Sequence, residues 1–221
     1  MNIFAAMISS KESGLGMTIA GKLLDIGAIK LNIDTPFTWS SGWKSPIYCD
    51  NRLSLSYPEL RTLIKTALSQ AIKKEFPEAE AIAGVATAGI PQGALVADEM
   101  ELPFLYVRSK PKGHGMENLI EGKIDLGQKV VVIEDLISTG GSSLKAAAAL
   151  REAEAEVLGM AAIFTYGFDL ASQNFEEAKV PTVCLSNYEY LINAALERSA
   201  IREDQQETLR AWRKNPSSWG H

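Results

Sequence analysis

The sequence predicts an α/β fold in which a central, mostly parallel sheet is flanked by helices. Four consecutive β-branched apolar residues, Val130 to Ile133, are typical of a strand that is buried on both faces. Strand-like and helix-like segments alternate along the chain, which favours parallel strands joined by helical crossovers. With 221 residues, 46% of them hydrophobic, the chain is long enough for one sizeable core.

The elements follow one another in a regular order. The expected helices cover residues 17–26, 56–72, 91–100, 144–154, 170–179, 187–196 and 200–213. The expected strands cover residues 28–32, 81–86, 102–107, 130–133, 157–166 and 181–185. Ser56, Pro58 and Glu59 favour a helix start, with Ser56 as N-cap and Glu59 completing a capping box.

The domain boundaries are predicted from the two ends of the chain. Residues 1–16 are small and polar, so we expect a loosely ordered extension, and residues 215–221 have the composition of a frayed tail. Residues 17–214 are expected to form one domain. It would have a small N-terminal hood at about 17–55 and a core at about 56–214.

Charge and cysteine content exclude several classes of protein. A net charge of −5 and a pI of about 5.2 disfavour a nucleic-acid-binding surface. Cys49 and Cys184 lack metal-ligand spacing and are too few for a disulfide framework, which fits a reducing cytoplasm. The chain shows neither a signal-peptide pattern nor a run of the roughly 18 apolar residues that a membrane span needs. We therefore expect a protein that is neither exported nor bound to a membrane.

The residues that suggest chemistry follow the Val130–Ile133 strand. Two carboxylates, Glu134 and Asp135, stand where we expect that strand to end, at the sheet edge where α/β proteins bind ligands. The next residues are hydroxyl-bearing or glycine, which suits a phosphate cradle at a helix start: Ser138, Thr139, Gly140, Gly141, Ser142 and Ser143. Because carboxylates repel phosphate, the acid pair more plausibly binds sugar hydroxyls or a hydrated Mg²⁺, which indicates a phosphorylated sugar.

Two other interpretations of this stretch are weaker. An ordinary strand-to-helix turn with a serine cap would leave Glu134 and Asp135 unexplained. A P-loop ATPase would need a second motif, and residues 16–23 come close to one. However, Leu23 replaces its Ser or Thr and no strand precedes it.

A second candidate site is the aperiodic segment 108–118. It gathers four basic or imidazole side chains among three breakers, Pro111, Gly113 and Gly115: Arg108, Lys110, Lys112 and His114. In isolation such a run is most often a solvated loop. Beside a phosphosugar site, a hinged cationic loop can close over the ligand and neutralise a departing pyrophosphate.

These motifs resemble those of a known family. Residues 129–143 resemble the PRPP-binding motif of type I phosphoribosyltransferases. Residues 108–115 resemble the Arg-…-Lys-x-His-Gly loop of the orotate phosphoribosyltransferases among them. A third element also matches that group, at Phe37, Thr38, Ser41, Gly42, Ser45, Pro46 and Tyr48. The three motifs occur in order over residues 37–143.

The resemblance implies a type I phosphoribosyltransferase fold. It also implies transfer of the 5-phosphoribosyl group from PRPP to orotate, which yields orotidine 5′-monophosphate and pyrophosphate in pyrimidine synthesis. Mg²⁺ would be the cofactor, bound through PRPP and water near Glu134 and Asp135 with no direct protein ligand. A homodimer would share its active sites through loop 108–118.

Site roles follow from the same resemblance. Arg108, Lys112, His114 and Asp135 are the expected catalytic residues. The expected PRPP-binding residues are Arg108, Lys110, Lys112, His114, Glu134, Asp135, Leu136, Ile137, Ser138, Thr139, Gly140, Gly141 and Ser142. Orotate would be bound by Ser138, Phe37, Lys44 and Tyr48.

The chain departs from the family pattern at several cationic positions. Ser109 follows Arg108 where many members have lysine, and we expect Lys110 to substitute for it. Ala88 and Ser40 also replace family lysines, with Lys44 as a substitute for the second. Residues 164–169 lack the family's orotate-binding arginine, so we expect the backbone of residues 37–48 to bind the orotate carboxylate.

Two alternative functions stay open at this point. One is a PRPP-dependent transferase for a purine base, which the Phe37–Tyr48 element disfavours. The other is a PRPP-sensing regulator that binds nucleic acid, which the acidic composition disfavours.

Overall fold

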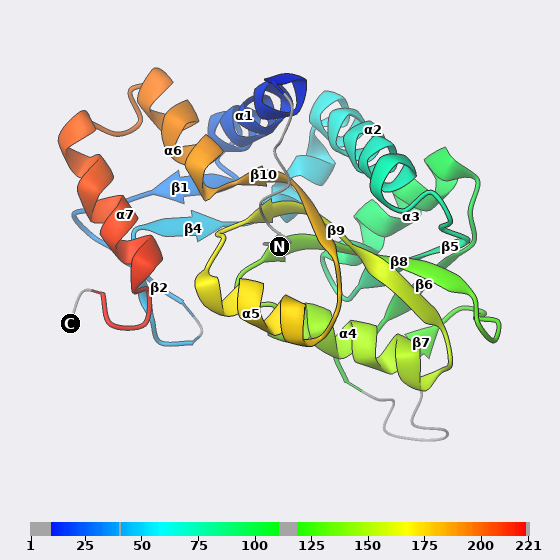
Figure 1. Cartoon of the computed structure of the whole chain (residues 1–221). Coiled ribbons are helices and arrows are strands. Elements are labelled where there is room, and N and C mark those ends of the chain that lie inside the picture. The colour runs from blue at the N-terminus through cyan, green and yellow to red at the C-terminus, as the bar shows by residue number, and fades with distance from the viewer. Residues whose placement is uncertain (1–9, 40, 111–118, 220–221) are drawn as a thin grey trace.

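The computed structural model describes residues 10–39, 41–110 and 119–219, with side chains from residue 14 onward. A six-stranded sheet forms the centre, in the order β10-β9-β8-β5-β6-β7 (Figure 1). Its strands are β5 Ala81–Val85, β6 Phe104–Val107, β7 Ile120–Glu121, β8 Lys129–Ile137, β9 Glu156–Thr165 and β10 Thr182–Asn187. All neighbours are parallel except β6 and β7, which confirms the predicted mostly parallel sheet.

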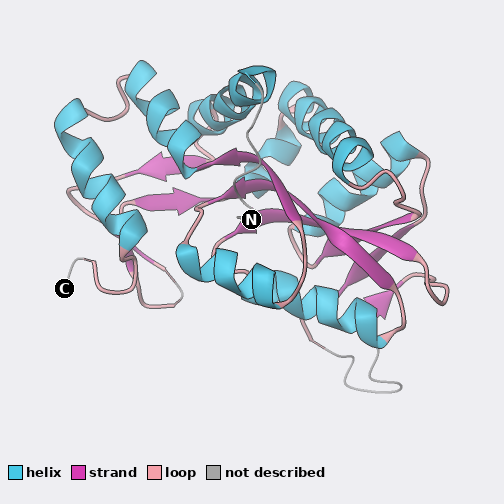
Figure 2. Cartoon of the chain, viewed as in Figure 1, coloured by secondary structure: helices cyan, strands magenta, loops and turns pink. Residues whose placement is uncertain are grey.

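Helices cover both faces of the sheet (Figures 1 and 2). One face carries α1 Ser10–Asp25, α2 Pro58–Glu75 and α3 Gly89–Met100, and the other carries α4 Gly141–Glu152 and α5 Asp169–Glu177. The chain then continues through α6 Tyr188–Glu197, the short 3₁₀ turn η2 Glu203–Gln205 and α7 Gln206–Lys214. This arrangement follows from the repeated strand–helix alternation of the sequence.

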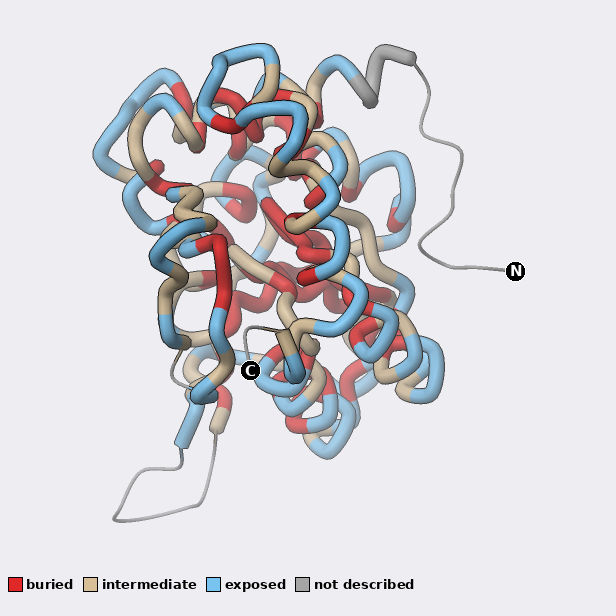
Figure 3. The backbone as a smooth tube through the Cα atoms, turned by 90° about the vertical axis from the view of Figure 1, so that its left-hand side faces the viewer, coloured by how far each residue is buried: buried red, intermediate tan, exposed pale blue. Residues whose placement is uncertain are grey.

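The core lies between the sheet and its helices. Every residue of β5 is buried, and β8 is buried from Val130 to Glu134. Figure 3 shows the buried segments in the interior of the molecule and the exposed ones around it. Each fully buried Val, Leu or Ile stabilises the fold by about 1.5–3 kcal/mol relative to exposure, so this double-sided burial fixes the position of β8.

Four short strands make up the rest of the N-terminal region. β1 Ile29–Leu31 pairs antiparallel with β4 Ile47–Cys49, and β2 Phe37–Thr38 pairs antiparallel with β3 Lys44–Ser45. The 3₁₀ turn η1 Asn51–Ser56 connects β4 to α2. Trp212 of α7 attaches the β2–β3 hairpin to the C-terminal region, because its indole N–H donates to the carbonyl of Lys44 at 3.1 Å.

Three predictions of local structure are wrong. Helix α1 begins at Ser10, so residues 10–16 are not a loose extension; Gly16 lies against the ring of Tyr190, where a Cβ would clash at 2.5 Å. Ser56 is not the cap of α2, since it belongs to η1, and Tyr57 occupies the N-cap position without a side-chain hydrogen bond. Residues 200–205 are not α-helical, because α7 begins at Gln206.

The most informative difference concerns β8. The expected strand ended at Ile133, but β8 continues to Ile137 because β9 is long enough to pair with it through Ile137 and Thr165. The two carboxylates therefore stand within the last part of the strand rather than after it. None of the described helices is both long and apolar enough to cross a membrane.

Candidate active site

Glu134 and Asp135 form a buried acidic pair near the carboxyl end of β8. The Glu134 side chain is only 5% exposed, and its two oxygens accept hydrogen bonds from the Ser143 hydroxyl at 2.9 Å and from the Asp135 N–H at 3.1 Å. Asp135 is less buried than Glu134. The two side chains interact directly, since each acid perturbs the pKa of the other.

Burial perturbs the titration of both acids. Burial first, and the neighbouring charge of Asp135 second, raise the pKa of Glu134 to about 8, while the hydrogen bond from Ser143 acts in the opposite direction. The pKa of Asp135 is also raised, mainly by burial, while its interactions with Glu134 and Arg52 act in the opposite direction. An acid pair that is costly to ionise is suited to bind hydroxyl groups or a cation, since either ligand replaces the lost water.

The segment after β8 forms an open anion cradle. Gly140 occupies the N-cap of α4 with φ +84°, and α4 has no side-chain cap. Ser143 donates instead to Glu134, so the structure does not support an ordinary serine-capped turn. Asn174 supports the cradle by donating to the carbonyl of Thr139 at 2.9 Å. The N–H groups of the first turn of α4 are thus available for an anion such as phosphate.

The other predicted residues of this stretch differ in position. Ser138 and Thr139 are half-buried in the turn, and Ser142 is exposed at the start of α4. Leu136 and Ile137 belong to β8, and the Ile137 carbonyl accepts from the N–H of Tyr166 at 3.2 Å. The ends of β8 and β9 are therefore joined directly beside Ser138.

A cavity of about 420 Å³ lies next to the cradle, between α4 and the ends of β5 and β6. Its polar lining consists of two cations, two hydroxyls and one carboxylate: Arg108, Lys145, Ser109, Ser142 and Glu152. Arg108 forms a 3.4 Å ion pair with Glu121, and its N–H donates to the Leu119 carbonyl at 2.8 Å. Arg108 and Leu119 therefore both lie at this cavity. Lys110 is exposed, while Lys112 and His114 lie outside the described residues.

The predicted orotate-binding residues of the N-terminal region are close to one another. The rings of Phe37 and Tyr48 are 5.8 Å apart, and Tyr48 is 41% exposed. Lys44 Nζ donates to the Thr38 hydroxyl at 2.9 Å. These groups make an aromatic and polar surface that suits a flat ligand.

Three residues that the sequence did not identify connect this surface to the sheet. Asn51 donates to the carbonyl of Asp135 at 2.7 Å. Trp39 packs on Tyr166 with 5.1 Å between ring centroids, and Trp212 contacts both rings edge-on. Only tertiary structure brings these distant positions together. The one signal in the sequence is the presence of two Trp residues in otherwise polar segments.

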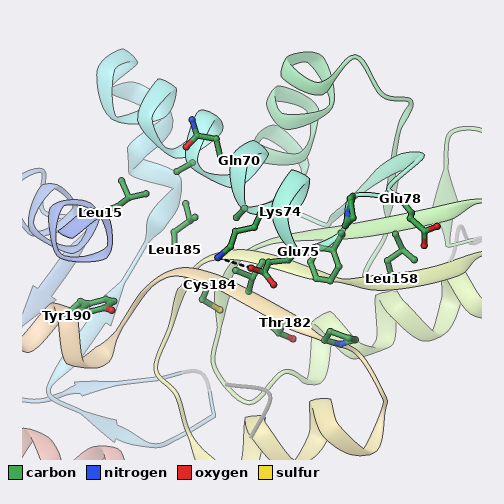
Figure 4. A pocket seen from close by; sticks show the side chains of 16 residues that line it. Leu15, Gln70, Lys74, Glu75, Glu78, Leu158, Thr182, Cys184, Leu185 and Tyr190 are labelled. Carbon is green, nitrogen blue, oxygen red and sulfur yellow. Dashed lines mark ion pairs between the residues drawn. The ribbon is translucent and has the colours of Figure 1, made fainter. Parts of the chain in front are cut away.

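A larger cavity, of about 750 Å³, lies elsewhere. Figure 4 shows it between α1, α2 and β10, with the ion pair of Lys74 and Glu75 at its side. Its lining includes Leu158, Pro181 and Thr182, at or next to the beginnings of β9 and β10. It therefore lies away from the carboxyl edge that carries the acid pair and the cradle.

The donor atoms near the acid pair limit how a metal ion could bind there. Within residues 10–39, 41–110 and 119–219, no three His, Cys, Asp or Glu side chains gather as a metal site. Glu134 and Asp135 offer carboxylate oxygens, the donors that Mg²⁺ prefers, but two such residues fill only part of its octahedral shell. A Mg²⁺ that brings its own substrate oxygens and water fits this pair.

Comparison with known proteins identifies the family. The model of the phosphoribosyl transferase domain matches residues 55–192. The orotate phosphoribosyltransferase of Porphyromonas gingivalis is 59% identical over 206 residues, covering 93% of this chain and 98% of that protein. That of Listeria innocua is 55% identical over 202 residues, covering 91% and 97%.

Solved structures agree with these sequence matches. The crystal structure of orotate phosphoribosyltransferase from Aeropyrum pernix has a TM-score of 0.72 at 27% identity, and the match covers 83% of this chain and 99% of that one. Both the predicted type I fold and the resemblance to the orotate phosphoribosyltransferases are thereby confirmed. The chain belongs to the phosphoribosyltransferase family and, within it, to the orotate phosphoribosyltransferases.

Proposed function

We propose that this protein transfers the 5-phosphoribosyl group from PRPP to N1 of orotate, giving orotidine 5′-monophosphate and pyrophosphate in pyrimidine synthesis. The observation that carries the proposal is the buried acid pair of β8 followed directly by the open cradle at the start of α4, in a chain whose relatives bear that enzyme's name. An acid pair and an anion cradle fit a sugar phosphate. The aromatic surface at Phe37 and Tyr48 fits a planar base.

Different residues bind the phosphate and the ribose of PRPP. The N–H groups and hydroxyls of residues 138–142 bind the 5′-phosphate, and Asp135 and Glu134 accept hydrogen bonds from the ribose hydroxyls. Asp135 is the more accessible contact, because both oxygens of Glu134 already accept hydrogen bonds within the protein. Fixing the ribose in this way orients the anomeric carbon toward the base and leaves no need for a protein nucleophile.

The leaving pyrophosphate requires cations. Arg108 lines the 420 Å³ cavity beside the cradle. Lys110, Lys112 and His114 follow it in the sequence, and we expect them to contact the pyrophosphate as well. Mg²⁺, bound through PRPP oxygens and water near the acid pair, supplies further neutralisation of the leaving group. Positive charge that is placed in advance at the pyrophosphate oxygens lowers the barrier to breaking the C1–O bond.

Assembly and location belong to the same proposal. Leu53 and Tyr57, on η1 and at the start of α2, are 40% and 44% exposed and offer apolar surface for a second copy. We propose a homodimer in which loop 108–118 of each subunit completes the site of the other. Cys49 and Cys184 are both unpaired thiols, which supports a reducing cytoplasm as the location.

The shared site can be tested by subunit exchange. Lys112→Ala and Asp135→Ala place their defects in different parts of one composite site. Mixed dimers of the two inactive variants should recover about a quarter to a half of the wild-type activity, because one of the two sites is then intact. Absence of recovery after verified exchange would contradict the composite site.

The reaction itself is tested by loss of orotate ultraviolet absorbance after mixing protein, orotate, PRPP and Mg²⁺. Parallel reactions contain uracil, hypoxanthine or adenine in place of orotate, and one reaction lacks Mg²⁺. The proposal expects turnover of orotate alone and its loss without Mg²⁺. Turnover of a purine base instead would overturn the substrate, and turnover of none would favour a PRPP-sensing regulator.

A further inference from the structure

The cation that binds the acceptor's carboxylate is still to be assigned. Orotate carries a carboxylate beside its ring, and a carboxylate that leaves water needs charged or strongly polar partners. Residues 164–169, where β9 ends beside Ser138, contain no basic residue. A partner must therefore come from another element.

The C-terminal helix brings an arginine to this point. Arg213 of α7 donates from Nη2 to the carbonyl of Gly167 at 3.2 Å. A Cβ built on Gly167 would be 3.2 Å from Nη2 and 3.8 Å from Cζ of the same arginine. The guanidinium thus lies where a side chain at position 167 would be. Because residue 167 is glycine, there is room for the arginine there.

The neighbourhood of Gly167 connects it to the proposed site. Its N–H donates to the Thr165 hydroxyl at 3.0 Å, and that hydroxyl donates to the Ile137 carbonyl at 3.2 Å. Ile137 is the residue before Ser138. Two hydrogen bonds therefore join the turn that holds Arg213 to the start of the predicted cradle.

The Arg213 guanidinium has several contacts, but they do not use all of its hydrogen-bond donors. Its Cζ lies 5.9 Å from the centroid of the Tyr188 ring, and its contact with Glu189 is long, at 3.9 Å between Nη1 and Oε2. The Glu189 side chain is 63% exposed and can turn to solvent. Since a guanidinium carries five N–H donors, Arg213 retains enough of them to meet a carboxylate with two parallel hydrogen bonds.

The adjacent tryptophan fixes the helix that carries Arg213. Trp212 is fully buried, packs edge-on against Tyr166 and Phe168 at 5.6 and 5.4 Å, and donates to the carbonyl of Lys44. The β2–β3 hairpin, the end of β9 and Arg213 are therefore held in one frame. This frame fixes the helix that carries the guanidinium relative to the hairpin whose Phe37 and Lys44 are predicted to bind orotate.

The other nearby cations of the described chain are less suited. Arg52 is already engaged by both oxygens of Asp50, at 2.6 and 2.9 Å. Arg108 lies beside the end of β6, two strands away from β8. Lys44 is exposed and offers a single strongly hydrated point charge.

We propose that Arg213 binds the carboxylate of the acceptor base and so determines specificity for an acidic pyrimidine. This inference rests on the proposed function. It replaces our expectation that the backbone of residues 37–48 binds that group.

The test compares Arg213→Met and Arg213→Lys with a matched control, Arg210→Met, which removes an exposed arginine one turn earlier on α7. Two constants are measured at saturating PRPP: KM for orotate, and the inhibition constant of the neutral methyl ester of orotate. We expect Arg213→Met to raise KM for orotate about tenfold or more while the ester constant and KM for PRPP stay within about twofold. Arg213→Lys should fall in between, and Arg210→Met should match the wild type.

The measured constants distinguish a carboxylate-binding role of Arg213 from a purely structural one. Equal losses for orotate and the ester would show a structural role and overturn the inference, as would an unchanged KM for orotate. If Arg213→Met proves unstable by thermal denaturation, Arg213→Lys decides by the same comparison of acid and ester. A wild-type protein that does not turn over orotate would instead refute the proposed function, and this inference with it.

Discussion

Glu134→Gln tests the electrostatics of the acid pair in the protein without substrates. The glutamate is 5% exposed, and burial raises its pKa from an ordinary value of 4.5 to about 8. Glutamine has nearly the same shape and cannot ionise. Its amide oxygen can still accept the Asp135 N–H, and the Ser143 hydroxyl can rotate to accept from its amide nitrogen.

The sign of the effect follows from proton linkage. Between pH 4.5 and about 8, the folded chain retains a proton on Glu134 that the unfolded chain has released, so stability falls as pH rises. One such proton corresponds to about 1.4 kcal/mol per pH unit. From about pH 5.5 to about pH 7.5, Glu134 should therefore cost the wild type up to about 2.7 kcal/mol that the glutamine variant does not lose.

Urea unfolding at these two pH values measures the effect, with Glu176→Gln on the exposed face of α5 as the control. The Glu134→Gln variant should lose distinctly less stability with rising pH than the wild type, and Glu176→Gln should follow the wild type. If Glu134→Gln and wild type lose stability equally over this range, Glu134 does not retain its proton in the folded chain. The account of the buried pair would then fail.

Three further substitutions test other parts of the site. Gly140→Ala forces a side chain into φ +84° and within 2.5 Å of Phe175, so it should cost about 1–3 kcal/mol in urea unfolding; Gly141→Ala, whose Cβ would meet no atom within 4 Å, should cost less, and equal costs would contradict the strained turn. Trp212→Phe leaves the Lys44 carbonyl without its indole donor, so it should cost about 1–3 kcal/mol of stability. By calorimetry, Tm should fall by about 2–4 °C for each kcal/mol lost. An unchanged Tm would show that this hydrogen bond does not hold α7 to the hairpin. Lys112→Ala should lower turnover far more than it weakens orotate binding, and unchanged turnover under saturating substrates would refute its role in pyrophosphate departure.

Much of the fold was predictable because its determinants are local. The β-branched run Val130–Ile133 requires a buried strand whatever its neighbours are, and the strand–helix alternation then dictates a parallel sheet. The end of β8 was not predictable in the same way. Ile137 remains in the strand only because Thr165 of β9 lies opposite, and pairing of this kind is a long-range property.

The same distinction applies to the site. The acid pair and the cradle lie within ten residues of each other, so their residue types alone identified them. Asn51 contacts Asp135 across 84 positions of the chain, and Arg213 contacts Gly167 across 46, and no local pattern reports such contacts. The start of α1 at Ser10 was missed because Gly14 and Gly16 suggested a loop, whereas Gly16 is needed for close packing on Tyr190.

The central claim is that the carboxyl end of β8 is the catalytic site, and a crystal structure with bound orotidine 5′-monophosphate tests it most directly. The account predicts the phosphate on residues 138–142, the ribose hydroxyls at Asp135 and Glu134, and the pyrimidine ring beside Phe37 and Tyr48. A nucleotide bound elsewhere, for example in the 750 Å³ cavity between α1 and α2, would contradict it.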